Sequence, residues 1–336
     1  MIRIATRNSA LAMAQARQVA ELLGGAELVE VSSDGERGDK GRFVRGVERA
    51  LLEGEADLGV HSAKDVPAEM AEGLTIAAVP VREDPADVWI GVGAALDDVP
   101  EGTRVGTASL RRQAQLLAAR PDLQIDDLHG NVDTRLRKLA AGEHDAIVLA
   151  AAGLRRLGRE DEASFAIPAE TMTPAAGQGA LVLQTRADDA ESTSAAAAVG
   201  DETALRELTA ERAAVALLDA TCASPIGVHA TLAPVRTEAT GATDGTEAGV
   251  AVEGAGELGP DPAPHSDVHA SPEAGVGDLL AIEAFVGLPD GSEWIRDRFQ
   301  ADAADPAAAG AQLAERLLGA GAREILDRAE DWLRRV

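Results

Sequence analysis

The fold class is decided by the stretch Arg104-Val105-Gly106-Thr107-Ala108-Ser109-Leu110-Arg111-Arg112-Gln113-Ala114-Gln115-Leu116-Leu117-Ala118-Ala119. It predicts a short strand at 104–106, a turn of small polar residues, and a helix at 110–119 that Pro121 stops. The same order recurs on both sides of this stretch, and alternating strands and helices are typical of βαβ units. We therefore predict an α/β fold.

Two similar α/β lobes with a cleft between them are the arrangement that this alternation favours. The first lobe is predicted to span residues 1–82 and 178–200, because the strand expected at 180–185 returns to it. The second lobe is predicted to span residues 83–177. Further strands are predicted at 2–5, 28–31, 58–61, 74–79, 123–128 and 146–150, and further helices at 11–23, 44–53 and 134–141.

The last third, residues 201–336, predicts a smaller α+β domain. Its expected elements are a helix at 204–218, strands at 228–233, 279–287 and 293–299, and a helix that Asp305 caps and Pro306 opens. Inside it, residues 237–277 are rich in small and acidic residues and have little apolar content. We predict a disordered acidic insertion there, with an ordered extension of the sheet as the alternative.

Composition narrows the class of protein. The chain has 336 residues and a net charge of −26, which argues against a basic nucleic-acid binder. Acidity combined with only three lysines favours adaptation to high salt over an ordinary acidic protein. One cysteine excludes an intrachain disulfide, and no apolar run has the length of a membrane span. A cytoplasmic protein without a membrane partner is therefore expected.

Three segments place arginine where a predicted helix begins after a strand. They are residues 6–9, 106–112 and 130–135, and each combines small polar residues with one or two arginines. Helix N-termini attract anions, and arginine adds a planar clamp for carboxylate or phosphate. Any one segment could be ordinary helix capping with a surface arginine, but three in an acidic chain predict a polyanion site. Since no phosphate loop is present, a ligand rich in carboxylates fits.

Two further residues are chemical candidates. Lys64, one of the three lysines, precedes Asp65 at the end of a predicted strand, where either a catalytic pair or a surface ion pair is possible. Cys222 follows a predicted helix, and its spacing alone favours a buried thiol over an exposed one. A cysteine protease or a metal site is disfavoured, because no partnered histidine or ligand cluster accompanies it.

Taken together, the motifs resemble the hydroxymethylbilane synthase (porphobilinogen deaminase) family. The resemblance covers nearly the whole chain in order and spacing, apart from residues 237–277. It is carried by Arg3-Ile4-Ala5-Thr6-Arg7, His61-Ser62-Ala63-Lys64-Asp65-Val66-Pro67, Arg82-Glu83-Asp84-Pro85, Gly106-Thr107-Ala108-Ser109-Leu110-Arg111-Arg112-Gln113, Gly130-Asn131-Val132-Asp133-Thr134-Arg135, Ala152-Gly153-Leu154-Arg155-Arg156-Leu157-Gly158, Pro174-Ala175-Ala176-Gly177-Gln178-Gly179-Ala180, Glu211-Arg212-Ala213, Cys222 with Pro225-Ile226-Gly227, and Gly321-Ala322-Arg323-Glu324-Ile325-Leu326.

The resemblance implies a monomeric transferase with two lobes like those of periplasmic binding proteins and a third domain that presents Cys222. A dipyrromethane cofactor would be joined to Cys222 by a thioether. Four porphobilinogen molecules would be added to it with loss of ammonia, and hydrolysis would then release hydroxymethylbilane. Asp65 matches the family's catalytic carboxylate, and Lys64 is expected to assist it. Family positions that hold the cofactor or the substrate match Arg7, Ser9, Phe43, Lys64, Thr107, Ser109, Arg111, Arg112, Asn131, Arg135, Arg156 and Gln178.

Some positions depart from the family pattern. His129 stands where arginine is usual, and Ala220-Thr221 replaces Gly-Gly before Cys222. The loop at 32–42 is also shorter than in bacterial relatives. Two rival functions are a binding module that only carries an anion and an enzyme that uses phosphate esters. The first gives Cys222 no purpose, and the second lacks a phosphate loop or metal carboxylates.

Overall fold

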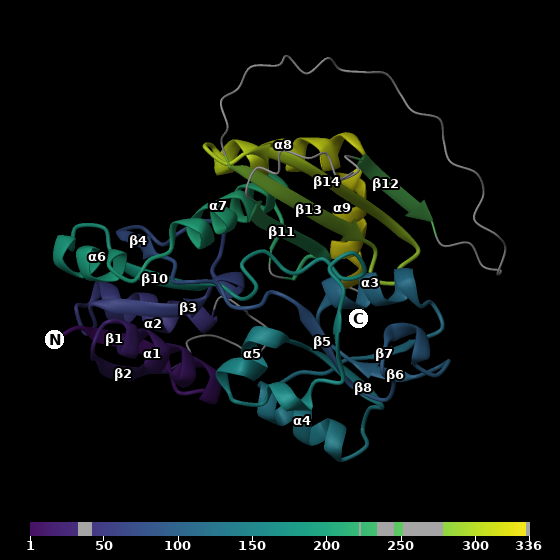
Figure 1. Ribbon diagram of the computed structural model, residues 1–336, viewed down its shortest axis with the longest axis horizontal. Coiled ribbons are helices and arrows are strands. Elements are labelled where there is room, and N and C mark those ends of the chain that lie inside the picture. Colours follow the sequence, from purple (N-terminus) through teal and green to yellow (C-terminus); the bar gives the residue numbers. More distant parts are fainter. Residues whose placement is uncertain (33–41, 222, 234–244, 251–277, 334–336) are drawn as a thin grey trace.

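Three β-sheets organise the chain in the computed structural model, which describes residues 1–32, 42–221, 223–233, 245–250 and 278–333 (Figure 1). In the first sheet the order is β2 (Glu27–Val31), β1 (Arg3–Arg7), β3 (Leu58–Ser62), β10 (Leu181–Arg186) and β4 (Leu74–Ala78). In the second it is β7 (Gln124–Asp126), β6 (Arg104–Gly106), β8 (Ala146–Ala150), β5 (Asp87–Gly91) and β9 (Phe165–Ile167). In the third it is β11 (Ile226–Ala233), β13 (Leu279–Gly287), β14 (Glu293–Asp302) and β12 (Gly245–Val250).

The first two sheets share one topology. Strand β1 runs parallel to β2 and β3, and β10 runs antiparallel to β3 and β4. In the same positions of the second sheet, β6 runs parallel to β7 and β8, and β5 runs antiparallel to β8 and β9. The predicted fold class, two similar α/β lobes with a smaller α+β unit, is confirmed.

Each lobe sheet is covered by helices on both faces, as expected for parallel strands joined by crossovers. In β1, Ile4 packs with Val19 of α1 (Ala10–Leu22), while its neighbour Ala5 packs with Leu51 of α2 (Arg42–Leu52) on the opposite face. In the second lobe, Val105 packs with Leu116 of α3 (Leu110–Ala119). The remaining helices are α4 (Val132–Ala140), α5 (Ala151–Arg156), α6 (Ala190–Ala197), α7 (Glu202–Leu217), α8 (Pro306–Gly319) and α9 (Ala322–Leu333).

The third sheet is antiparallel and packs one face on helices α7, α8 and α9 (Figure 1). The expected cap of α8 is present, because Ala308 N–H donates to Asp305 Oδ1 at 3.0 Å and Pro306 opens the helix. The prediction of disorder for 237–277 is wrong at residues 245–250, which form β12 along β14. Although this segment has little apolar content, β12 is held by backbone pairing with β14 and by the Trp294 ring, which covers Gly249. The rest of 237–277 lies outside the described residues.

The chain crosses between the lobes twice, at 79–86 and 168–180, and these two segments pack tightly. Gly179 adopts φ +88°, and a Cβ there would lie 2.1 Å from the Glu83 carbonyl oxygen. Gly177 adopts φ +73°, and its Cβ would lie 2.7 Å from that of Ala63. Because a side chain at either position would collide with the backbone of Glu83 or with Ala63, just after β3, glycine is required for this close approach.

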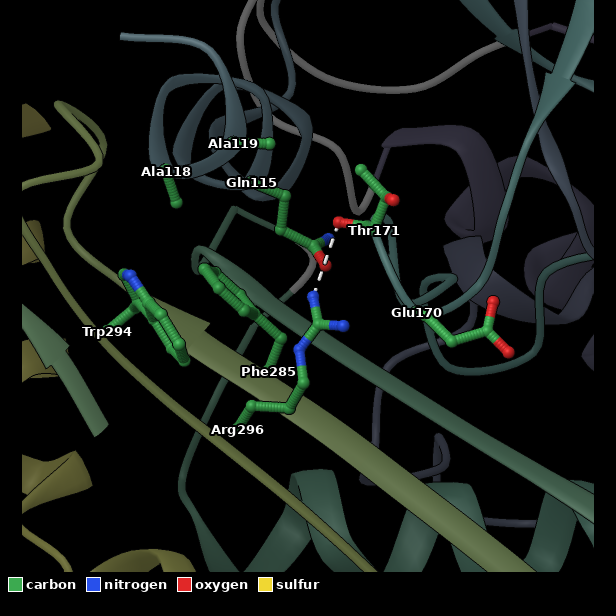
Figure 2. A pocket seen from close by; sticks show the side chains of 8 residues that line it. All are labelled: Gln115, Ala118, Ala119, Glu170, Thr171, Phe285, Trp294 and Arg296. Carbon is green, nitrogen blue, oxygen red and sulfur yellow. Dashed lines mark hydrogen bonds between the residues drawn. The ribbon is translucent and has the colours of Figure 1, made fainter. Parts of the chain in front are cut away.

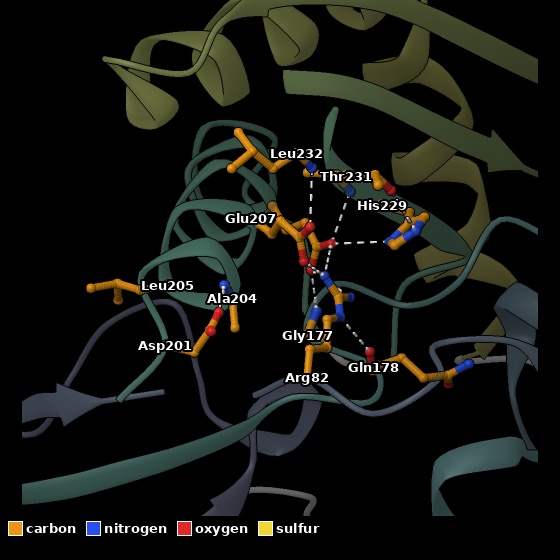
Figure 3. Close-up of polar contacts among 12 residues, drawn as sticks. Arg82, Gly177, Gln178, Asp201, Ala204, Leu205, Glu207, His229, Thr231 and Leu232 are labelled. Carbon is orange, nitrogen blue, oxygen red and sulfur yellow. Dashed lines mark hydrogen bonds and ion pairs between the residues drawn. The ribbon is translucent and has the colours of Figure 1, made fainter. Parts of the chain in front are cut away.

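A buried ion pair ties the crossovers to the third unit (Figure 3). Arg82, on the first crossover, donates from Nη1 to Glu211 Oε1 at 2.7 Å and from Nη2 to Oε2 at 3.2 Å. Glu211 lies on α7 and also accepts from Gly177 N–H at 2.6 Å and from Ala230 N–H of β11 at 2.9 Å. One carboxylate therefore joins both crossovers to the third sheet.

Among the helices of the described residues, none is both long and apolar enough to cross a membrane.

Candidate active site

The predicted site residues follow the carboxyl ends of the parallel strands, where open α/β sheets bind ligands. Ser9 caps α1, with Ala12 N–H donating to its Oγ at 3.3 Å, and Ser109 caps α3 through Arg112 N–H at 3.5 Å. Thr107 is buried, and its Oγ1 accepts from Ser109 N–H at 3.2 Å. Asn131 stands at the N-cap of α4 without a side-chain capping bond. The starts of α1 and α3 therefore have the side-chain capping that their sequences indicate, and the start of α4 does not.

Arg111 and Arg112, in the first turn of α3, converge on one buried carboxylate. Asp87 Oδ1 accepts from Arg112 Nε at 3.0 Å and from Arg112 Nη2 at 2.7 Å. Asp87 Oδ2 forms an ion pair with Arg111 Nη2 at 2.7 Å. Burial alone would raise the pKa of Asp87, but the two guanidinium groups override it and lower the pKa to about 2. Asp87 is therefore ionised at any pH where the protein functions.

Lys64 approaches the same cluster from the first lobe. It lies in a 3-10 helix, Ala63–Asp65, that follows directly on β3, and the strand predicted at 58–61 extends to Ser62. Its Nζ donates to Gln178 Oε1 at 3.2 Å, and Gln178 Nε2 donates to Asp87 Oδ1 at 3.1 Å. Burial, followed by repulsion from Arg112, lowers the pKa of Lys64 to about 8. Gln178 thus bridges the two lobes between a cation and a carboxylate.

Two more arginines add positive charge to this region. Desolvation lowers the pKa of Arg156 to about 10, and desolvation with repulsion from Arg112 does the same for Arg135. Arg156 Nη2 donates to Gly179 O at 2.7 Å, but its buried Nε has no hydrogen-bond partner among the described residues. A buried donor without an acceptor is costly, so this arrangement suits an anionic ligand.

The other predicted residues lie near the same strand ends. Arg7 ends β1 and lies near enough to buried His61 to help lower the pKa of that imidazole, which burial brings to about 4. Asp65 is half-buried at the end of the 3-10 helix beside Lys64. Phe43 lies in the first turn of α2, but its side chain is outside the described residues. Cys222 itself also lies outside them.

The residues that flank Cys222 bring its loop close to α3. Strand β11 begins at Ile226, and a Cβ on Gly227 would lie 2.5 Å from the Thr173 carbonyl oxygen. That same oxygen accepts from Arg111 Nη1 at 2.7 Å. The loop therefore returns to the third sheet beside a segment that Arg111 binds.

The structure describes most of the positions that depart from the family pattern. Among the described non-glycine residues, Asp219 is the one with a positive φ, 52°, so Ala220 and Thr221 adopt conformations open to any residue. His129 is exposed, and its Nε2 lies 2.9 Å from Asp127 Oδ2. The loop at 32–42 lies outside the described residues except at its two ends, Ser32 and Arg42.

Sequence reasoning did not single out Asp87, and it quoted Arg82 and Glu211 in separate motifs without foreseeing that they pair. Their partners are 25 and 129 residues away in the chain, so no local pattern reveals the pairing. One available signal is that Asp87 opens an apolar strand, Val88-Trp89-Ile90. A charged residue at the start of a buried strand needs a partner, and this one could have been flagged for that reason.

A separate hollow lies between α3 and the third sheet (Figure 2). It measures about 250 Å³ and is lined by Gln115, Ala118, Ala119, Glu170, Thr171, Phe285, Trp294 and Arg296. Arg296 Nη2 donates to Thr171 O at 3.2 Å across it. None of the predicted site residues whose side chains the structure describes lines this hollow, so it is distinct from the cation cluster.

The fold and the cluster define a class: a two-lobed α/β protein with buried cations gathered where the lobes meet. Comparison with known proteins narrows it. Residues 2–194 match the family model described as porphobilinogen deaminase, dipyromethane cofactor binding domain. The chain is 39% identical to the porphobilinogen deaminase of Syntrophus aciditrophicus, over 98% of this chain and 99% of that protein.

The porphobilinogen deaminase of Brevibacillus brevis is 38% identical over 96% of each chain. Among solved structures, the periplasmic VFT2 domain of Bordetella pertussis BvgS covers 59% of this chain and 86% of its own, with a TM-score of 0.38 and 17% identity. The chain belongs to the porphobilinogen deaminase family. The resemblance that the motifs indicate is confirmed, and so is the dipyrromethane cofactor that they imply.

Proposed function

We propose that this chain is a hydroxymethylbilane synthase, a transferase that joins four porphobilinogen molecules head to tail on a covalent dipyrromethane and releases hydroxymethylbilane. The single observation that carries the proposal is the group of cations at the lobe junction. Asp87 is the carboxylate that Lys64, Arg111 and Arg112 share. Arg112 also repels Arg135, and Arg156 donates to Gly179 O beside Gln178.

A pyrrole chain is the ligand that this cluster suits best. Each porphobilinogen carries two carboxylates, so the growing chain is a polyanion that gains charge at every step. The buried Nε of Arg156 has no acceptor among the described residues, and burial outweighs the attraction of Glu83 for Arg156 and of Asp127 for Arg135, so both guanidinium groups would gain from a bound anion. Arginine holds carboxylates in a planar, two-point geometry, which would keep each ring in register.

The dipyrromethane, when bound, supplies the pyrrole carbon to which the first porphobilinogen is joined. In the proposal Cys222 holds it by a thioether, and Arg111, Arg112, Ser109 and Thr107 bind its side chains. The described flanks of the Cys222 loop support this role, because β11 packs on the carbonyl of Thr173 that Arg111 also binds.

Asp65 and Lys64 are the residues that we assign to the reacting centre. Asp65 would stabilise positive charge on the pyrrole nitrogen of the reacting ring and take up or return its proton. Lys64 would bind a carboxylate of that ring as an ammonium, since Gln178 orients its Nζ. Arg7, Ser9, Asn131 and Phe43 complete the proposed contacts from the surrounding strand ends.

The domain division also belongs to the proposal. Residues 1–82 with 178–200 would form the first lobe, 83–177 the second and 201–336 the cofactor-bearing domain. The sheet order supports this division, because β10 joins β3 and β4. A monomer in the cytoplasm remains the expected state.

Product stoichiometry tests the proposal. Purified protein supplied with porphobilinogen should release four ammonia molecules for each linear tetrapyrrole that leaves the enzyme. Asp65→Ala should still carry the cofactor but turn over very slowly. Absence of tetrapyrrole formation by the wild-type protein would contradict the function, and near-normal turnover by Asp65→Ala would remove Asp65 from the mechanism.

A further inference from the structure

Asp87 is the centre of the cation cluster, although no motif singled it out. It is completely buried at the first position of β5. Its carboxylate receives Arg112 in a two-donor contact to Oδ1, Arg111 at Oδ2, and the amide of Gln178 at 3.1 Å. Through Gln178 it is also linked to Lys64 in the other lobe.

The two arginines need this carboxylate to adopt their positions. Arg111 and Arg112 are neighbours in one helix turn, so their like charges repel. Burial is the main cause of the lowered pKa of Arg111, and the charge of Arg112 lowers it as well. Arg112 further donates from Nη1 to Val148 O at 2.8 Å, and Arg111 from Nη1 to Thr173 O at 2.7 Å. Each guanidinium is thus fixed at two points, one of which is Asp87.

We propose that Asp87 is a positioning residue, which fixes the Arg111 and Arg112 guanidinium groups in the orientation that receives the cofactor's carboxylates. The inference rests on the proposed function and adds a residue to it. Asp87 touches neither cofactor nor substrate in this account. It acts by keeping both long side chains from sampling other rotamers, so that their conformational entropy is lost on folding and not on ligand binding.

A simpler role makes the opposite prediction, which gives the proposal a sharp test. If Asp87 only offset buried positive charge, its removal would raise the local potential and strengthen anion binding. If it positions the arginines, its removal weakens anion binding although the site becomes more positive. The sign of the change therefore decides between the two roles.

The experiment compares Asp87→Asn, which removes the charge, with Asp87→Glu, which keeps the charge but moves it by one methylene. Full-length apo-protein from a host unable to make porphobilinogen is given porphobilinogen, and the mass gained at Cys222 is followed by intact-mass spectrometry. Loading is scored on the fraction that elutes as folded protein with a native circular dichroism spectrum. Asp145→Asn is the matched control, because Asp145 pairs with Arg104 at the surface of the same lobe.

Both Asp87 variants should load about tenfold more slowly or worse, since small misplacements of binding groups have effects of this size. The KM for porphobilinogen should rise in the loaded fraction, while Asp145→Asn behaves like wild type. Faster or unchanged loading of Asp87→Asn, or normal loading of Asp87→Glu, would overturn the proposal. Failure of the wild-type protein to gain any mass would instead refute the proposed function.

Discussion

Substitution of Glu211 by glutamine tests the buried ion pair that joins the crossovers to the third sheet. The Glu211 side chain is completely buried and pairs with Arg82, which is itself nearly buried. Burial alone would raise the pKa of Glu211, but Arg82 and then His229 lower it, so the carboxylate is charged in the folded protein. Glutamine keeps the shape, removes the charge, and places an amide donor among donors.

Each oxygen of Glu211 shows why glutamine cannot substitute. Oε1 accepts from Arg82 and from Ala230 N–H, and Oε2 accepts from Arg82 and from Gly177 N–H. Whichever way the amide turns, its NH₂ meets two other donors, and Arg82 loses its short two-donor contact and keeps the longer one with Glu207 Oε2, at 3.4 Å. Breaking a buried pair in this way costs about 3–5 kcal/mol of unfolding free energy.

Urea denaturation followed by both tryptophan fluorescence and circular dichroism measures this cost. The control is Asp145→Asn, whose exposed pair with Arg104 should contribute about 0–1 kcal/mol. A Glu211→Gln cost as small as that of the control would refute the reasoning.

Four further predictions concern the site. Activity should fall as pH rises through about 8, because Lys64 loses its proton there. In a plot of kcat/KM against pH, Lys64→Arg should move this alkaline fall to higher pH. A fall at the same pH would exclude Lys64 as its source. Asp65→Asn should load cofactor normally but lower kcat at least about 100-fold, a loss typical of acid–base groups, and a smaller loss counts against the assigned role. Arg156→Met should raise the KM for porphobilinogen and also raise the thermal midpoint, because it removes an orphaned buried donor; a lower midpoint would contradict this reading. Finally, burial lowers the pKa of His61 to about 4. The free energy of unfolding should therefore be unaffected by His61 above pH 6.5 and should fall by about 3 kcal/mol as the pH drops to 4, because the unfolded chain binds the proton first. His61→Asn should remove this part of the pH dependence of unfolding, and an unchanged pH dependence would exclude His61 as its source.

Local signals in the sequence predict the helix starts and most strands well. Ser9, Ser109 and Asp305 cap the helices expected of them, because a cap depends on residues only three positions apart. Strand β8 and helix α3 have the predicted bounds, since β8 is a short apolar run and α3 combines an apolar pattern with the stop signal at Pro121. The arginine-bearing turns follow from the same local rules.

Features fixed by distant partners could not be predicted in the same way. Strand β12 has little apolar content and exists through its pairing with β14, so composition alone indicated disorder. Lys64 lies in a 3-10 helix because Gly177 packs against Ala63 and the chain turns there. The role of Asp87 depends on partners in α3 and in the second crossover, which only the folded chain brings together.

The central claim is that Cys222 carries a dipyrromethane held in a cluster of cations at the lobe junction. The intact mass of full-length protein purified from a porphobilinogen-producing host tests it most directly. We predict a mass that exceeds the sequence mass by one dipyrromethane, and a Cys222→Ala variant of unmodified mass. A wild-type protein at its bare sequence mass, or a Cys222→Ala variant that keeps the excess, would contradict the account.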